Sequence, residues 1–422
     1  MNMRSYLRAA LAVLSGAIPL LADNTAVLPF SNVSSGSGPS AAAIGNPASM
    51  DWIGESIAET LRVALAARGV FTLERKDIAE AYRRLQLRER TDLTEGSILK
   101  LGEVLDAEQV VHGTFSFVPS AASSAGTPAG ASKGSLRIQA RVSDRRRLRQ
   151  SAVFEETGAL EDLATLESHL AWRALTVVAP ARAPAESEFR SLRAPVPLDA
   201  LENYIRGLLA AAPEQKQKYF AQAARLDPDF SPPAFELGKI HFERKEYREA
   251  AELLERVGPA ENHYREASFF LGIARYQAGD FEGAHKAFQA VAEKVPIAPV
   301  WNNLGAAESR LNLPQAVETM RKALEQDPSD PDYHFNLGYA LFKKGDFAAA
   351  ADRFRAVLDR DSGDQMATLL LGRCLKKQGL RSATASDARL QALERLKDTY
   401  EERVYFQLKS ILESPPASDP RQ

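Results

Sequence analysis

The sequence has one cysteine, Cys374, among its 422 residues. A single cysteine excludes an intramolecular disulfide and any metal cluster built from cysteines. The chain also has no large excess of charge of one sign, because it contains 53 basic and 55 acidic residues and its net charge is −2. This balance gives the whole molecule no attraction to nucleic acid or anionic lipid. Hydrophobic residues make up 45% and charged residues 26% of the chain, which predicts folded domains rather than wholesale disorder.

Long hydrophobic runs are scarce, and the one near the N-terminus is short. Arg4 and Arg8 precede an uncharged run of 14 residues from Ala9 to Ala22. As a helix this run spans about 21 Å, less than the roughly 30 Å of a bilayer core. A basic start before a short apolar run predicts a signal peptide over residues 1–22 and export to the periplasm or cell envelope. The alternative is an N-terminal helix packed on the first domain, and the cleavage point stays open.

Residues 24–178 show the mixed periodicities of an α/β domain. Leu136, Ile138, Ala140 and Val142 alternate with polar residues, which indicates a strand with one wet face. Apolar residues repeat every three to four positions in the helical segments. Residues 120–134 are rich in Ala, Ser, Gly and Pro and predict a mobile hairpin tip. We expect a mixed sheet with strands at 25–30, 70–73, 110–118, 136–142 and 151–156, and helices at 52–68, 78–85, 98–105 and 163–174.

Three segments of this domain together resemble a known family. They are Val27 to Asn32, the helix from Trp52 to Arg68, and the run from Leu101 to Gly113. In this order they resemble the N-terminal domain of TolB-like proteins, which is related in shape to subunits of envelope assembly and secretion systems. The resemblance implies a bacterial cell-envelope protein. The long segments after Asn32 and at 120–134 depart from the family pattern.

Leu-Gly pairs recur through the second half of the chain. Their glycines are spaced 34, 33, 33 and 34 residues apart and are Gly238, Gly272, Gly305, Gly338 and Gly372. A glycine inside a helix costs about 0.5–1 kcal/mol relative to alanine, so five of them predict a packing role. Small residues follow eleven or twelve positions later, at Ala250, Ala284, Ala316 and Ala350, and bulky ones four positions after these. The pattern resembles the tetratricopeptide repeat, which implies stacked helical pairs.

The predicted fold class is therefore α/β plus all-α, a mixed-sheet α/β domain followed by a tetratricopeptide-repeat α-solenoid. The predicted domains are a signal peptide at 1–22, the α/β domain at 24–178, a proline-containing linker at 179–197 and the repeats at 198–380. Leu393, Leu396 and Leu408 predict a terminal capping helix over 381–412. Residues 413–422 are predicted to be a disordered tail.

In such a solenoid the first helix of each pair lines a groove, and the resemblance implies which positions face it. They are Phe235, Lys239, Phe242, Phe269, Ile273, Tyr276, Asn302, Phe335, Tyr339, Phe342, Arg373 and Lys376. Aromatic residues there could anchor a peptide, and Arg373 and Lys376 could receive an acidic group. The alternative is that the aromatics pack between repeats. Asn303 and Asn336 are interpreted as common repeat residues that form no carboxylate clamp.

The sequence has no recognisable catalytic or metal-binding motif. Its six histidines show no metal-ligand spacing, and the basic cluster from Arg145 to Arg149 is interpreted as a solvated turn. The sequence predicts no enzyme, cofactor or metal. The leading hypothesis is an envelope scaffold that binds other proteins or peptides and no nucleic acid, and peripheral association with the envelope stays open. The alternatives are an oligomerising subunit of an envelope assembly or secretion system, and a small-ligand sensor that uses the α/β domain. The oligomeric state stays open.

Overall fold

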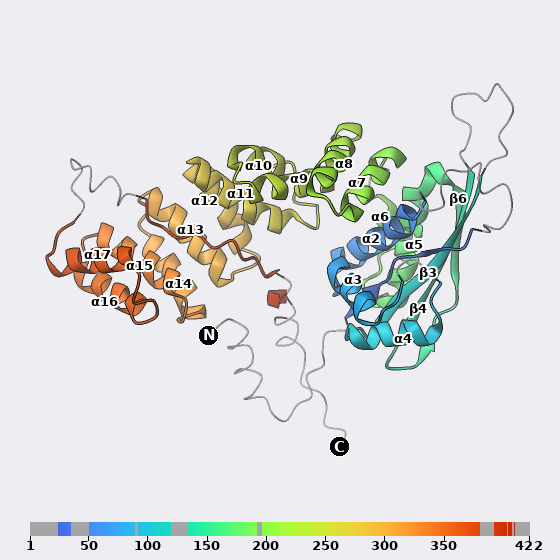
Figure 1. Cartoon of the computed structure of the whole chain (residues 1–422), viewed down its shortest axis with the longest axis horizontal. Helices are drawn as coiled ribbons and strands as arrows, with labels where there is room; N and C mark the ends of the chain where they lie inside the picture. Colours follow the sequence, from blue (N-terminus) through green and yellow to red (C-terminus); the bar gives the residue numbers. More distant parts are fainter. Residues whose placement is uncertain are drawn as a thin grey trace, which may run out of the picture. The chain divides into compact units, whose positions relative to one another are not determined.

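The computed structural model describes residues 24–34, 50–88, 92–119, 134–191, 196–379, 392–402, 404–406 and 409. The predicted signal peptide, the hairpin tip at 120–133 and the tail at 413–422 lie outside these residues. The described chain divides between Ala234 and Phe235 into two compact units. Each unit is considered by itself below, and Figure 1 gives the labels of their elements.

The first unit contains the predicted mixed sheet. Its strands are β1 (Thr25–Val27), β2 (Ser31–Asn32), β3 (Gln109–Pro119), β4 (Gly134–Asp144), β5 (Arg149–Gln150) and β6 (Phe154–Ala159). β1 and β2 run parallel to β3, whereas β3, β4 and β6 form an antiparallel meander. The segment predicted as a strand at 70–73 contributes one parallel bridge, Thr25 to Thr72. The alternation along β4 is confirmed, because Leu136 and Ile138 are fully buried while Arg137 is exposed.

Helices of the first unit bury apolar stripes against this sheet and against one another. They are α2 (Trp52–Ala67), α3 (Arg75–Arg84), α4 (Glu95–Val104) and α5 (Leu163–Val178), and Figure 1 shows them beside the strands. The predicted stripe of α2 is confirmed, since Ile53, Ile57 and Leu61 are fully buried. α3 and α4 share a core with β1 and β3 in which Ala26, Leu28 and Val110 take part. Burial of these side chains supplies the main driving force for folding the unit.

The first unit continues past the predicted linker. Short helices η4 (Pro180–Arg182) and α6 (Glu186–Ser191) follow α5, and α7 (Leu198–Leu209) and α8 (Pro213–Leu226) form a helical pair. Arg75 of α3 donates a hydrogen bond of 3.1 Å to the carbonyl of Leu208 in α7. A Cβ on Gly207 would lie 2.4 Å from the ring of Phe220, so α7 and α8 meet as closely as the later pairs do.

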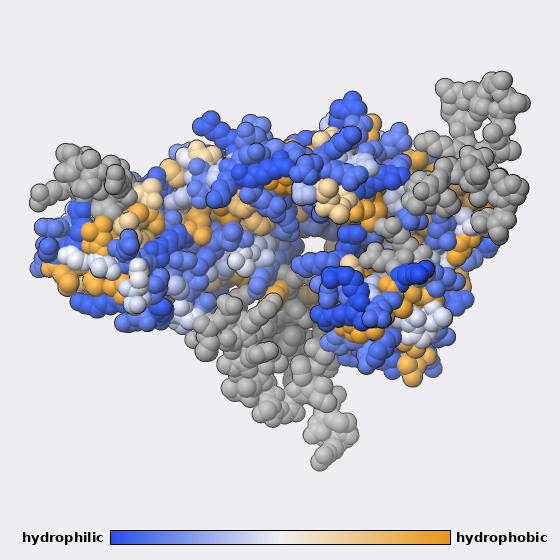
Figure 2. All heavy atoms as spheres, in the orientation of Figure 1, coloured by the Kyte–Doolittle hydropathy of each residue, from blue (hydrophilic) through white to orange (hydrophobic). Residues whose placement is uncertain are grey.

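The second unit is the predicted solenoid of antiparallel helical pairs (Figure 1). The pairs begin with α9 (Pro232–Glu243) and α10 (Tyr247–Leu254), followed by α11 (Tyr264–Ala278) and α12 (Phe281–Ala292). The next are α13 (Ala298–Arg310) with α14 (Ala316–Gln326) and α15 (Pro331–Lys343) with α16 (Phe347–Leu358); α17 (Gln365–Leu375) begins a further one. Hydrophilic residues predominate on the visible face of the repeats in Figure 2.

The glycines of the Leu-Gly pairs make room for a bulky side chain of the following helix. A Cβ on Gly272 would lie 2.6 Å from Phe288, and one on Gly305 would lie 2.6 Å from Met320. The same crowding occurs at Gly238, whereas nothing among the described residues lies within 4 Å of a Cβ on Gly372. The alanines at 250, 284, 316 and 350 are buried. The packing role predicted for the glycines is thus observed in four helical pairs.

The predicted capping helix over 381–412 is wrong for residues 392–401, which form no helix. We call residues 392–402 the tail segment. The backbone N–H groups of Arg395 and Lys397 bond to asparagine side chains of the repeats instead of to helical carbonyls four residues earlier. Leu369 and Leu375 of α17 are 48% and 64% exposed, so the described tail does not cover them. No described helix combines the length and the apolar character needed to cross a membrane.

Candidate functional site

The candidate site is the face on which the repeats hold the tail segment. The tail segment contacts side chains of α11, α13 and α15 together with Asp330 and Asp364, and we call these side chains the binding face. Figure 1 shows the segment as an extended red stretch across these first helices. Residues of the face that contact it are Arg265, Phe269, Tyr276, Asn302, Asn303, Ser309, Arg310, Asp330, Asp332, Phe335, Asn336, Lys343 and Asp364.

Asparagine side chains fix the backbone of the tail segment. Asn336 donates to the carbonyl of Arg395 at 2.7 Å and accepts from its N–H at 2.8 Å. Asn303 pairs in the same way with Lys397, at 2.7 and 2.8 Å. In an extended chain, residues two apart present their N–H and C=O groups on the same side, so the two asparagines read alternate residues. Asn302 adds a bond of 2.8 Å to the carbonyl of Arg395.

Asn303 and Asn336 lie at equivalent positions of two successive repeats. Asn303 and Asn336 each precede a Leu-Gly pair and lie 33 residues apart. Both are fully buried, and Asn336 also donates to the Oδ1 of Asn302 at 2.7 Å. A buried amide that lacks partners costs about 1–3 kcal/mol, so the paired backbone stabilises the site. The structure adds a role to their interpretation as common repeat residues, because both asparagines hold a backbone.

A buried pocket receives the carboxylate of Glu394, whose side chain is 0% exposed. The hydroxyls of Tyr276 and Ser309 donate to it at 3.2 and 3.0 Å. The Nζ of Lys343 lies 3.6 Å from one oxygen, and a guanidinium nitrogen of Arg310 lies 4.0 Å from the other. Burial raises the pKa of Tyr276, and the Glu394 charge adds to this effect. Tyr276 therefore stays a neutral hydrogen-bond donor at ordinary pH.

Acidic side chains at the starts of α15 and α17 receive the two cations of the tail segment. Arg395 pairs with Asp364 at 2.7 Å and with Asp332 at 3.2 Å, and its guanidinium lies 3.7 Å from the Phe335 ring centroid. Lys397 lies 2.8 Å from Asp330. Burial opposes the charge on Asp332, but Lys397 and Arg395 outweigh it and lower its pKa.

An aromatic contact and a further ion pair hold the far end of the tail segment. The ring of Tyr400 stacks on that of Phe269 with a centroid distance of 4.9 Å. Arg265 pairs with Glu402, whose carboxylate also accepts from the Tyr400 hydroxyl at 2.9 Å. Leu396 and Tyr400 pack on the core that contains Ile273. Burial raises the pKa of Tyr400, so its hydroxyl stays protonated at ordinary pH.

Some predicted groove positions meet the tail segment and others do not. Phe269, Tyr276, Asn302 and Phe335 contact it directly, and Ile273 shares a core with it. Tyr339 and Phe342 are buried in the core of the last repeats, against which Leu393 of the tail segment packs. The residues that the sequence interpretation missed are the polar ones, Ser309, Arg310, Lys343 and the aspartates at 330, 332 and 364.

The aromatics of α9 pack within the repeats. Phe235 is 2% exposed and stacks on His263 with a centroid distance of 4.6 Å. Phe242 packs edge-on against Phe270 at 5.1 Å. Lys239 pairs with Glu266 at 3.0 Å. Burial opposes the charge of Glu266, but the His263 hydrogen bond and Lys239 lower its pKa to about 2.

The acidic group predicted to bind at Arg373 and Lys376 stays a prediction. A guanidinium nitrogen of Arg373 donates to the carbonyl of Gly379 at 2.8 Å, closing the end of α17. Lys376 is exposed. The Glu394 carboxylate lies against Lys343 and Arg310, one and two repeats before α17. Charge alone did not predict the site that holds Glu394. Arg310 and Lys343 lie at the C-terminal ends of first helices, where basic residues are common.

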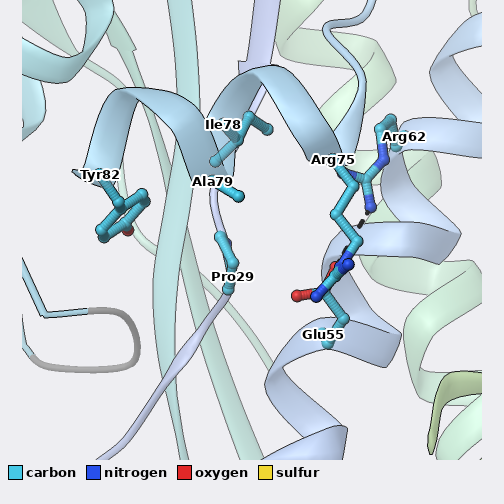
Figure 3. Close-up of a pocket in the computed structure, with 7 residues that line it drawn as sticks. All are labelled: Pro29, Glu55, Arg62, Arg75, Ile78, Ala79 and Tyr82. Atoms are coloured by element: carbon cyan, nitrogen blue, oxygen red, sulfur yellow. Dashed lines mark hydrogen bonds and ion pairs between the residues drawn. The ribbon is translucent and has the colours of Figure 1, made fainter. Parts of the chain in front are cut away.

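The α/β unit has a smaller polar cluster beside Pro29, shown in Figure 3. Glu55 of α2 lies 3.0 Å from Arg75 and 3.6 Å from Arg62, and its side chain is 5% exposed. The cavity beside them measures about 10 Å³, which is room for about one water molecule. The cluster thus joins α2 to α3 through a paired buried charge. The described residues include no group of three or more His, Cys, Asp or Glu arranged for a metal ion.

A family model of the tetratricopeptide repeat matches residues 236–299, 269–331, 306–365 and 335–399. None of the curated proteins compared with the chain matches it. Among solved structures, YrrB, a TPR protein with an unusual peptide-binding site, is 19% identical; the match covers 42% of this chain and 92% of that one, with a TM-score of 0.38.

Two further solved structures are similar to this chain. MamA from Desulfovibrio magneticus is 23% identical, over 40% of this chain and 99% of that one, with a TM-score of 0.36. PilF from Pseudomonas aeruginosa is 18% identical, over 46% of this chain and 87% of that one, with a TM-score of 0.34. Tetratricopeptide repeats are typically non-catalytic scaffolds that bind peptides or other proteins. The second unit contains tetratricopeptide repeats, which its helical pairs and the matches of the family model support.

Proposed function

We propose that this chain is a non-catalytic interaction scaffold whose repeats bind an extended segment of a partner protein. The observation that carries the proposal is the pairing of Asn303 and Asn336 with alternate residues of an extended backbone. Backbone pairing of this kind accepts many sequences in one conformation, as strand addition does at a sheet edge. In the structure, the chain's own tail segment takes the place of the partner.

Photo-crosslinking in cells tests this proposal. A photoreactive residue at Ser309, which contacts Glu394, should crosslink to other proteins, and the yield should fall when Asn303→Ala and Asn336→Ala are introduced together. The same photoreactive residue at Asn203, a partly exposed position of α7 outside the binding face, is the control and should give a background unchanged by these substitutions. Crosslinks from position 309 that reach only residues 392–402 of the same chain would contradict the proposal.

The proposal for where the scaffold acts in the cell is based on the sequence. The basic start and short apolar run of residues 1–22 support export, and we propose a role in the bacterial cell envelope, as the resemblance to TolB-like domains implies. A reporter that is active only outside the cytoplasm should be active when fused after Thr25. A silent reporter in cells that make the full fusion would remove the envelope role and leave the binding face untouched.

A further inference from the structure

The binding face contacts side chains as well as the backbone, because four side chains of the tail segment each meet a surface of matching chemistry. A buried cationic and hydroxyl pocket holds Glu394, and an acidic site that begins one residue later holds Arg395 and Lys397. The ring of Phe269 receives Tyr400. Along the segment the order is an acidic residue, a basic residue, an apolar residue, a basic residue, two further residues and an aromatic residue.

We propose that the binding face selects partner segments with this charge order, and that the tail segment mimics such a segment in the same chain. This inference rests on the proposed function, since it specifies which extended segments the face takes. The occupant is an extended protein segment with one acidic side chain immediately before a basic one.

Because Asn303 and Asn336 hold the backbone in place, the order of the charges along a segment matters as well as their number. The two asparagines hold the backbone at the positions of 395 and 397, so the side chain at each position of a bound segment meets a fixed surface, and a shift by one residue moves all charges of the segment together. A segment with the first two charges exchanged would put a cation beside Lys343 and Arg310 and an anion beside Asp332 and Asp364. Like charges at a desolvated site are strongly unfavourable, which gives discrimination between two segments of equal composition.

The tail segment also competes with a partner. It belongs to the same chain, so its binding is intramolecular, and for a short connection its effective concentration is of millimolar order. A partner segment of the same order must exceed that concentration or bind more tightly. The chain thus holds its own binding face closed until a stronger segment arrives.

Peptide binding to the full chain tests the inference. The released variant carries Glu394→Arg and Arg395→Glu, which exchange the two charges of the tail segment and leave all helices unchanged. One probe is a fluorescent peptide with the sequence of residues 392–402, and the other has its Glu-Arg pair reversed to Arg-Glu. Thermal melting confirms that the repeats of the variant remain folded.

We expect the native-order peptide to bind the released variant at least tenfold more tightly than the reversed peptide does. We also expect it to bind the wild-type chain at least tenfold more weakly than it binds the variant. Equal binding of both peptides would overturn the charge order while leaving the proposed function in place. Binding of neither peptide would overturn both, and equal binding to variant and wild type would overturn the competition by the tail.

If the released variant is unstable, the wild-type chain gives a second test. At high peptide concentration the native-order peptide should displace the tail segment and expose the bonds after Arg395 and Lys397 to trypsin. The reversed peptide should leave these bonds protected. Equal cleavage with both peptides would contradict the selection of charge order.

Discussion

The first helices of the first and of the middle repeats differ in what their side chains contact. On α9, Phe235 and Phe242 bury their rings against neighbouring helices, and Lys239 forms an ion pair within the repeats. On α13 and α15, Asn302, Asn303 and Asn336 bond to an extended segment from outside the repeats. The comparison teaches that being on the first helix of a pair does not make a residue part of a binding face; its available polar groups decide.

The largest expected effect comes from the first repeat. Phe235→Ala should reduce the free energy of unfolding of the repeats by about 3–5 kcal/mol, because it removes a buried ring. Under conditions where the repeats stay folded, the protection of the Arg395 and Lys397 amides should not change. Urea unfolding and hydrogen exchange measure the two effects. Loss of tail protection in folded protein would place Phe235 in the binding face after all.

In the middle repeats, a substitution on the binding face should weaken docking of the tail segment. Asn336→Ala should weaken docking of the tail segment by about 1–3 kcal/mol for each group of Arg395 left without a partner. Trypsin cleavage after Arg395 and Lys397, followed by mass spectrometry, measures release of the tail. Asn203→Ala, which removes an amide of α7 that donates to the carbonyl of Asp199, is the matched control and should leave cleavage unchanged. Equal protection in both variants would contradict the assigned role of Asn336.

Substitutions of two Leu-Gly glycines test the packing of the helical pairs. Gly272→Ala should destabilise the repeats by about 1–3 kcal/mol, because its Cβ would crowd the buried ring of Phe288. Gly372→Ala is the matched control, since its Cβ would meet no described atom within 4 Å. It should be neutral or stabilise the helix by up to about 1 kcal/mol. Thermal melting distinguishes the two, and equal shifts would contradict the packing account.

The smallest expected effect is the pH dependence of docking. The pKa of Asp332 in the docked state lies below its ordinary value of 3.8, since Lys397 and Arg395 outweigh burial. A lowered pKa contributes stability above that ordinary value and loses it as the pH falls through the docked value. Binding of the 392–402 peptide to the released variant should therefore weaken below about pH 4. Asp332→Asn in the same variant should flatten this dependence, and weakening that begins near neutral pH would argue for another group.

The repeats were predictable because period, residue type and packing agree. Glycines spaced 33 or 34 residues apart meet bulky residues of the next helix, as at Gly272 and Phe288. The wet and dry faces of β4 followed from alternation alone. Such features depend on neighbours within one repeat or one strand, which local sequence patterns encode.

The site was less predictable because its partners are distant in the sequence. Leu393, Leu396 and Tyr400 have helical spacing, but the amide of Arg395 bonds to a side chain 59 residues away and that of Lys397 to one 94 residues away. These tertiary bonds override the local preference for a helix. One signal was present: only two Leu-Gly pairs of the repeats follow an asparagine, and those asparagines form the site.

The most direct test of the central claim is residue-resolved hydrogen exchange of the Arg395 and Lys397 amides in the full chain. Both amides donate to buried asparagine side chains, at 2.8 Å each. We predict that they exchange far more slowly than in a free peptide of residues 392–402, and that Asn336→Ala speeds exchange at Arg395. Exchange of both amides at the free-peptide rate in the wild-type chain would contradict the account.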